Sequence, residues 1–224
     1  MNTEERKHKP KRNGYRSTKS REIRTTQDRT KRKWNTYPKR FGLIVDFFPS
    51  GRSIMAQNRN QRSSKPVAHV LDGYFTLLEL TLPDGKRYNP NSAFGTSIKF
   101  HRGQIIQRLQ FEDLSESAQE QIPSAVEKIV YGKPMRFLDF FNKAESLSPR
   151  LHQLRLLPGI GTARMWKILK ARKTKPFTSV EDLKERTGLS DPLGMIIHRV
   201  IEEIKEQPNY PLFVRNSSDS RRMA

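Results

Sequence analysis

The sequence contains no cysteine. A chain without cysteine forms no disulfides, has no thiol nucleophile and cannot hold zinc or an iron–sulfur cluster through sulfur. Acidic side chains are scarce as well: 23 Asp and Glu stand against 43 Lys and Arg, so the formal net charge is +20 in 224 residues. Such an excess of positive charge favours polyanionic partners, which are nucleic acids and anionic membrane surfaces.

Long apolar runs are also missing. No stretch approaches the roughly eighteen apolar residues of a membrane-spanning helix, and the basic N-terminus lacks the apolar core of a secretory signal. We therefore expect a soluble, cytoplasmic protein without a membrane partner. Of the two kinds of polyanion, nucleic acid is the favoured one.

The sequence lacks the motifs of common enzyme classes. It has no Walker loop, no dinucleotide fingerprint and no Gly-x-Ser-x-Gly nucleophile elbow. The five histidines are dispersed without the spacing of metal ligands. Metal-dependent phosphodiester cleavage would need clustered carboxylates, but Asp46, Asp72, Glu79 and Asp84 show no defined pairing. We expect a non-catalytic protein with no metal, no cofactor and no small-molecule substrate.

More than half of the excess charge lies near the N-terminus. Residues 1–40 hold 15 Lys and Arg against 4 Asp and Glu, a net charge of +11. Because residues 1–36 have almost no large apolar side chains, we expect them to form a flexible basic arm that orders along a phosphate backbone. An aromatic ring beside cations can also stack on an exposed base. The candidate contacts in the arm are Lys31, Arg32, Lys33 and Trp34, although Trp34 could instead belong to the following domain.

The residue pattern of 37–110 is typical of a small β domain. The strands expected here are 41–48, 67–71 and 74–82, with weaker candidates at 97–100 and 104–108. Glycine-bearing turns separate them, among them Asp72-Gly73, and one long polar loop follows the first strand. About five short strands of this kind fit a small, partly open barrel. We expect an OB-like barrel, with an SH3-like barrel as the alternative because sequence periodicity does not separate the two.

Helical patterns follow the β domain. In a connector, residues 111–147, a capping box predicts a helix from Ser124 to Tyr131, and a second helix is expected over 135–142 with Met135 in the core. In a last domain, residues 148–214, Ser148-Pro149 predicts a helix running through Leu157. The predicted fold class is therefore α+β and multi-domain, and residues 215–224 are expected to be a flexible tail.

The strongest functional pattern is the stretch Leu157-Pro158-Gly159-Ile160-Gly161-Thr162-Ala163. Two glycines one residue apart allow a tight turn and leave the backbone bare for a partner. A helix beginning near Thr162 offers unpaired N–H groups and the positive end of its dipole, which together attract a phosphate. Ile160 is expected to point inward, and Ala163 to let two helices pack closely.

Basic side chains follow this turn on the same expected helix, which is typical of a helix-hairpin-helix nucleic-acid module. Apolar residues, including Trp166, flank the turn on both sides. The candidate phosphate-binding residues are Gly159, Ile160, Gly161, Thr162, Ala163, Arg164, Lys167 and Lys170. The alternative is an ordinary pair of antiparallel helices whose lysines meet only solvent.

A second helix pair follows, and it reads as a repeat of the first with its second glycine missing. Ser179 and Asp191-Pro192 predict the two helix starts, and the loop between the helices is residues 187–190. Without the second glycine a nest of bare amides is not expected. We assign this degenerate half to packing, through an apolar stripe on the helix that ends near Glu206.

Several longer motifs, taken together and in this order, resemble the archaeal family known as domain of unknown function 655. These motifs are Gly73–Glu79, Phe111–Leu114, Phe140–Ala144, His152–Leu154, Leu156–Trp166, Lys175–Phe177, Glu181–Leu183 and Asp191-Pro192. The resemblance spans about residues 40–214 and implies an OB-like domain joined to a helix-hairpin-helix domain that binds RNA or nucleotides. The family has no assigned catalytic residues, and its genes often neighbour translation genes. This chain departs from it in a longer, more basic arm and in residues 89–103.

The sequence thus favours a non-catalytic RNA-binding protein associated with ribosomal RNA or the ribosome. RNA is expected to be preferred over DNA, and ribosomal proteins are further expected partners. Two alternatives remain open at this point. One is a DNA-binding accessory factor of repair or recombination, and the other is a scaffold of transcription or translation complexes.

Overall fold

The computed structural model describes residues 40–51, 53–56, 59–62, 65–83 and 97–214. The candidate arm residues Lys31, Arg32, Lys33 and Trp34, the segment 84–96 and the tail 215–224 lie outside the described residues. Contacts within the chain cluster into two units, Met1–Thr36 and Tyr37–Ala224. Everything below concerns the second unit.

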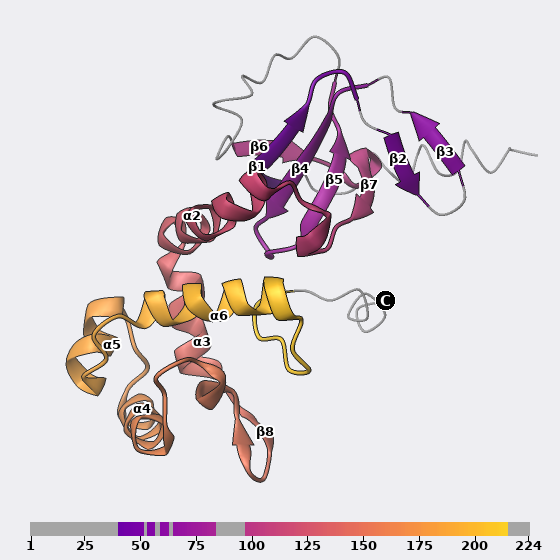
Figure 1. The fold of residues 1–224 in the computed structure, drawn as a ribbon. Helices are drawn as coiled ribbons and strands as arrows, with labels where there is room; N and C mark the ends of the chain where they lie inside the picture. The colour runs from indigo at the N-terminus through magenta and orange to yellow at the C-terminus, as the bar shows by residue number, and fades with distance from the viewer. Residues whose placement is uncertain (1–39, 52, 57–58, 63–64, 84–96, 215–224) are drawn as a thin grey trace, which may run out of the picture. The chain divides into compact units, whose positions relative to one another are not determined.

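Five strands form one antiparallel sheet (Figure 1). Their order across the sheet is β6-β1-β4-β5-β7. The bounds are β1 (Arg40–Phe48), β4 (Val67–Asp72), β5 (Leu77–Thr81), β6 (Ser97–Phe100) and β7 (Ile105–Arg108). A separate two-stranded ribbon pairs β2 (Ser53–Ala56) with β3 (Arg59–Arg62), inside the stretch expected to be one long loop.

The edges of this sheet are joined by a very short connection. β6 pairs with β1 and β7 pairs with β5, yet only His101 and the 3-10 turn η1 (Arg102–Gln104) lie between β6 and β7. In a flat sheet the two edge strands would be about 19 Å apart, at ~4.8 Å per strand. A connection of this length, partly wound into a 3-10 turn, is too short to span that distance. The sheet therefore has to curl and bring its two edges together.

The two faces of the sheet bury different clusters, because successive side chains of a strand point to opposite sides. One face encloses a core of its own. That core consists of Ile44, Ala68, Val70, Leu78, Leu80, Leu82, Ile98 and Phe100. On the other face, Val45, Leu71 and Leu77 join a larger apolar cluster shared with the helices.

The turn between β4 and β5 is longer than the sequence suggests. The strand expected from Tyr74 begins only at Leu77. The buried carboxylate of Asp72 explains the difference, because it accepts hydrogen bonds from the N–H groups of Tyr74 and Thr76, each at 2.9 Å. Arg40 donates to the same carboxylate. Asp72 thus organises a wider loop rather than a two-residue hairpin.

The first helix starts earlier than predicted. The capping box at Ser124 is the wrong start, because α2 spans Glu116–Gly132 and is capped by the Ser115 hydroxyl, which accepts from the Ala118 N–H at 3.3 Å. Burial of Ala118 and Ile122 on the packed face carries the helix through Pro123. The next helix, α3 (Pro134–Lys143), buries Phe137, Leu138 and Phe141. Met135, predicted to be in the core, is 57% exposed.

The predicted helix from Ser148 to Leu157 is wrong. Ser148 and Pro149 lie instead in a two-stranded ribbon of β8 (Ser146–Ser148) and β9 (Leu151–His152), followed by the short 3-10 helix η3 (Gln153–Leu156). The ribbon is closed at its base by Gln153, whose N–H donates to the Glu145 carbonyl and whose side chain accepts from the Glu145 N–H at 2.8 Å. A Ser-Pro pair starts turns as readily as helices, so these long-range bonds decide the outcome.

Three further helices complete the described part. They are α4 (Thr162–Thr174), α5 (Val180–Thr187) and α6 (Pro192–Glu206), and the predicted caps are confirmed at Ser179 for α5 and Asp191 for α6. The apolar stripe predicted on α6 is buried at Leu193, Ile196 and Val200. α6 packs against α2. Among the described residues, no helix has the length and apolar character that crossing a membrane would require.

Candidate nucleic-acid interface

The turn before α4 is shaped by one glycine and pinned by one apolar side chain. Gly159 has a φ of +77°, a left-handed conformation that side-chain-bearing residues rarely adopt. Ile160 follows with only 4% of its side chain exposed, and its N–H donates to the Leu157 carbonyl at 3.2 Å. The turn is therefore rigid, with Ile160 anchored in the core and the backbone on either side facing out.

The backbone conformation of Gly161, unlike that of Gly159, does not require a glycine. This residue is the N-cap of α4 with a φ of −80°, which any residue can adopt, and a Cβ added to it would meet nothing within 4 Å. No side chain caps this helix, and no acidic residue lies in its first turn. The first N–H groups of a helix have no partner within it, and at the start of α4 they belong to exposed residues at the positive end of the dipole.

The residues that follow Gly161 keep this helix end open. Thr162 and Ala163 are both exposed. The prediction that Ala163 serves close packing of two helices is therefore wrong, because its side chain faces solvent and not another helix. A small exposed side chain here leaves room for a ligand to reach the backbone amides.

The second helix pair gives an internal comparison. Gly188 has a φ of +72° and Leu189 is 3% exposed, so this loop repeats the left-handed glycine and the anchored apolar residue of the first turn. Its helix start is different. The Asp191 carboxylate accepts from the Gly194 N–H at 2.9 Å, and Pro192 at the first helical position has no N–H to offer. A carboxylate already occupies the place where a phosphate would bind, whereas the start of α4 is open.

The two loops lie next to each other. A Cβ placed on Gly159 would lie 3.6 Å from the methyl group of Met195 on α6, and one placed on Gly188 would lie 3.2 Å from Nζ of Lys167 on α4. Lys167 thus extends from the first helix pair to the loop of the second. The ammonium group of Lys167 therefore lies beside the loop of the second helix pair, although the start of α6 is closed by Asp191.

The cations of α4 do not all face the same surroundings. The helix contains Arg164, Lys167, Lys170, Arg172 and Lys173 and no carboxylate. All of these except Arg172 are exposed. Arg164 donates to the Gly159 carbonyl at 2.7 Å, so it stiffens the turn while its charge stays near the helix start.

Arg172 has a structural role. Its guanidinium donates to the carbonyl of Phe141 in the last turn of α3 at 3.0 Å and to that of Ala144, the C-cap of α3, at 2.7 Å. Burial lowers the pKa of Arg172, while Glu145 acts in the opposite direction. A charged side chain that donates to the last carbonyls of a helix stabilises that helix end, so the Arg172 guanidinium links α4 to α3.

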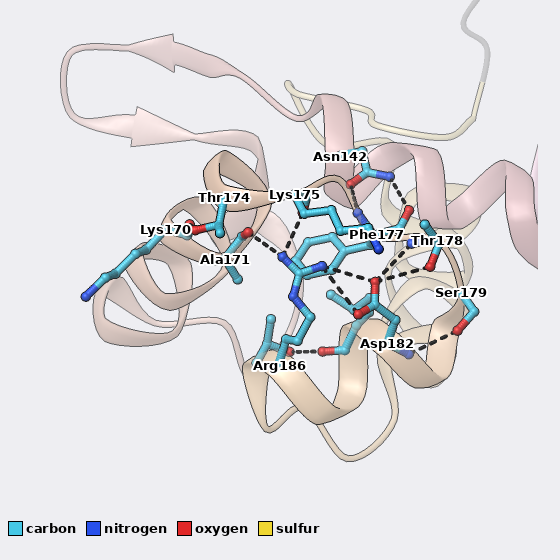
Figure 2. A network of polar contacts seen from close by, with 12 residues as sticks. Asn142, Lys170, Ala171, Thr174, Lys175, Phe177, Thr178, Ser179, Asp182 and Arg186 are labelled. Atoms are coloured by element: carbon cyan, nitrogen blue, oxygen red, sulfur yellow. Dashed lines mark hydrogen bonds and ion pairs between the residues drawn. The ribbon is translucent and has the colours of Figure 1, made fainter.

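The far end of α4 is held by Arg186 of α5 (Figure 2). Arg186 donates to the carbonyl of Ala171 in the last turn of α4 and, at 2.7 Å, to the carbonyl of its C-cap, Lys175. Asp182 pairs with Arg186 at 3.1 Å, and the Phe177 ring lies 4.7 Å from the guanidinium. The pKa of Asp182 is lowered, first by the hydrogen bond from the Thr178 N–H and further by Arg186.

His152 fixes the approach to the turn. Its Nδ1 accepts a hydrogen bond from the Leu154 N–H at 3.1 Å, which caps η3 directly before the Gly159 turn. Burial lowers the pKa of His152, and Arg172 lowers it further. The neutral imidazole is therefore the form that holds η3 in place.

Trp166 was not predicted as a site residue. Its side chain is 62% exposed on α4, while Met165 and Ile168 on the same helix are buried. Helical periodicity contained the signal, because Met165 and Ile168 already occupy the inward face and Trp166 falls outside it.

The described residues contain no group of three or more His, Asp or Glu side chains placed to hold a metal ion. The arrangement that the structure does offer is a backbone one. An open helix start, a turn held by Gly159 and several exposed cations can bind a phosphate group without any covalent chemistry.

Fold and site together define a class: a mixed α/β protein whose five-stranded antiparallel sheet precedes helices, among which α4 has an uncapped, cation-rich start. The chain belongs to the family described as protein of unknown function DUF655, whose model matches residues 39–215. The resemblance noted in the sequence is thereby confirmed.

Relatives of the chain come from archaea. The uncharacterized protein MJ0038 of Methanocaldococcus jannaschii is 27% identical over 183 residues, which cover 78% of this chain and 79% of that protein. The crystal structure of Af1531 from Archaeoglobus fulgidus is similar with a TM-score of 0.61 and 34% identity. That match covers 79% of this chain and 99% of the other.

Proposed function

We propose that this protein is a non-catalytic RNA-binding protein that acts on ribosomal RNA or the ribosome. The observation that carries the proposal is the open start of α4. Gly161 has neither a capping side chain nor an intramolecular reason to be glycine, and exposed cations follow it on the same helix. A backbone phosphate fits this combination better than any other common ligand group.

The same proposal interprets the fold more finely. We interpret the curled sheet as an OB-like barrel, with an SH3-like barrel as the alternative. Residues 148–214 are interpreted as a helix-hairpin-helix domain whose second hairpin is degenerate. The paired left-handed glycines Gly159 and Gly188 support this interpretation, as do the anchors Ile160 and Leu189.

The preference for RNA over DNA rests on the family, whose genes often neighbour translation genes. Backbone contacts alone do not distinguish the two polymers well, and they predict strong salt dependence with modest sequence preference. The basic arm would add phosphate contacts along a groove, with Lys31, Arg32, Lys33 and Trp34 as its candidates.

Two experiments test this function. Crosslinking in cells followed by sequencing should recover ribosomal RNA, and recovery of chromosomal DNA would instead support the repair accessory alternative. In a competition assay with the full chain, an rRNA fragment should displace duplex DNA of equal length at moderate salt. If neither polymer binds at low salt, or if partners stay bound after nuclease treatment, the scaffold alternative replaces the proposal.

A further inference from the structure

The exposed tryptophan on α4 has a position that extends the proposed function, and the following inference rests on that function. Trp166 has the largest exposed fraction of the large hydrophobic side chains in the described residues, at 62%. No aromatic stacking contact or cation–ring contact involves it among those residues. A ring of this size left in water is characteristic of an interaction surface, where tryptophan contributes much of the binding energy.

The ring lies on the same face as the phosphate site. Residues three and four apart on a helix are neighbours on its surface, so Trp166 lies one turn after Thr162 and one turn before Lys170. At a rise of 1.5 Å per residue, each of these steps is about 6 Å along the helix axis. The indole is therefore placed between the open amides at the start of α4 and the ammonium group of Lys170.

The charges around the ring indicate what covers it. Arg164, Lys167 and Lys170 are exposed near it, and α4 has no carboxylate. An apolar surface of another protein would have to desolvate these cations without compensation, which is costly. A nucleic-acid strand offers phosphates for the cations and the flat face of a base for the ring, so its chemistry matches both.

Stacking on Trp166 requires a base with one free face, which decides whether that base is paired or unpaired. In a continuous duplex both faces of each base are covered by the neighbouring base pairs, whereas bases in single strands, bulges and loops can be splayed out and stacked on aromatic side chains. We propose that Trp166 stacks on an unpaired base of the RNA strand whose phosphate is held at the start of α4. The ligand is then single-stranded or bulged RNA and not a continuous duplex.

Intrinsic fluorescence tests this directly, because the chain has only two tryptophans. In a Trp34→Phe background Trp166 is the sole reporter. Single-stranded RNA should quench its emission on binding, and a blunt duplex of the same sequence should not. If single-stranded RNA binds without changing the fluorescence, the stacking proposal is overturned.

Affinities separate this proposal from the function on which it rests. In the same background, Trp166→Ala should weaken single-stranded RNA binding by about 5- to 100-fold, while Trp166→Phe retains most of it, because stacking on an aromatic ring is worth that much per base. Duplex affinity should barely change. Tyr210→Ala, which removes another exposed ring at 52% exposure, is the matched control and should have little effect.

Three other outcomes decide the matter. Equal losses of single-stranded and duplex affinity in Trp166→Ala would overturn stacking and leave the phosphate site standing. A change of sedimentation coefficient in Trp166→Ala without RNA would show that a second copy covers the ring. Absence of RNA binding by the unmodified chain would overturn the proposed function itself, and the stacking proposal with it.

Discussion

At the scale of single residues, the two glycines of the turn have different physical origins. Gly159 is required by its own backbone, because its φ of +77° strains any residue with a Cβ. Gly161 is not required by anything within the molecule, since its conformation is ordinary and the space around it is open. A residue that the fold does not explain but that bares a helix start is best explained by a ligand, so substitutions at Gly161 separate binding from folding.

Replacing Gly161 with Asp should stabilise the fold and weaken RNA binding. Asp is a better N-cap than Gly, so the free energy of unfolding should rise by a few tenths of a kcal/mol. The new carboxylate would take the amides and repel a phosphate, which should lower RNA affinity by about tenfold or more. Chemical denaturation and fluorescence anisotropy measure the two effects.

Gly132→Asp is the control for added negative charge. Gly132 also has open space where a Cβ would be, and it lies at the end of α2, away from the start of α4 in the sequence. This variant should bind RNA nearly as well as the unmodified chain. Equal losses of affinity in the two variants would mean that net charge, and not the start of α4, explains the effect.

A buried carboxylate on α6 holds the last described residues. Glu203 accepts hydrogen bonds from the N–H groups of Leu212, Phe213 and Val214 at 2.6 to 2.9 Å and pairs with Arg199 at 2.8 Å. Glu203→Gln should lower the free energy of unfolding by about 3 kcal/mol, because Arg199 stays buried without its buried charge partner and keeps only the part-exposed Glu202.

Glu202→Gln is the matched control for this effect. Glu202 pairs with the same Arg199 at 2.9 Å, but its side chain is 33% exposed, so its loss should cost less than about 1 kcal/mol. Urea unfolding of both variants checks the difference. Similar midpoints for the two would contradict a special role for the buried carboxylate.

At the scale of elements, α4 is fixed along its length before any ligand arrives. Arg172 links α4 to the end of α3, and Arg186 donates to carbonyls at the C-terminal end of α4. The ribbon β8–β9 and the 3-10 helix η3, which His152 caps, lead into the start of α4. A phosphate that binds the amides therefore does not have to order the helix first, which keeps the entropic cost of binding low.

Stability should depend on the protonation of His152. Burial lowers the pKa of His152 in the folded chain, so below about pH 6.5 the unfolded chain takes up a proton that the folded chain does not. The contribution of His152 to stability is therefore full at neutral pH and decreases as the pH falls below that value. His152→Asn keeps a short acceptor but does not titrate.

Unfolding midpoints measured between about pH 5 and pH 8 test this sign. The His152→Asn chain should lose less stability on acidification than the unmodified chain. A His198→Asn variant, at an exposed position of α6, is the control for replacing a histidine with an asparagine. A larger acid loss in His152→Asn would contradict the assignment.

The exposed lysines of α4 should act as individual phosphate contacts. Lys167→Ala and Lys170→Ala should each reduce the slope of log affinity against log salt by about one unit. Lys143→Ala on α3 is the control, because Lys143 is also exposed but pairs with Asp139 at 2.8 Å. Anisotropy titrations at several salt concentrations give the slopes, and unchanged slopes for both α4 variants would move the site elsewhere.

At the scale of the whole molecule, the charge is distributed between a long basic N-terminal stretch and the folded part. Residues 1–40 hold +11 of the net +20. In our proposal residues 37–214 provide the phosphate-binding site at the start of α4, and the arm, residues 1–36, extends the contact along the RNA. Affinity and its salt dependence should therefore depend strongly on the arm, while the stability of the folded part should not.

Deleting residues 1–36 tests this division. The deletion removes 13 Lys and Arg and 4 Asp and Glu, a net charge of +9. The thermal midpoint of the remaining chain should not change, while RNA affinity at low salt and the salt slope should both decrease. A lower thermal midpoint would mean that the arm supports the fold, and an unchanged salt slope would remove it from the interface.

The sequence predicted much of the element types but not all of the boundaries. The caps at Ser179 and Asp191 were predicted because their local patterns are unambiguous and agree with the buried stripe of α6. Ser124 and Ser148 carry equally good local patterns and failed. At Ser124 the buried face of α2 extends the helix toward Ser115, and at Ser148 the bonds between Glu145 and Gln153 form a ribbon instead.

By itself the sequence determined the family, the excess of positive charge, the absence of thiol chemistry and the glycine turn before a basic helix. These follow from composition and local spacing. Only the tertiary structure decided that Ala163 and Trp166 face solvent, that Arg172 serves α3, and that α4 has an open start while α6 has a closed one. Which face of a helix is buried depends on elements distant in sequence, and no local pattern encodes that choice.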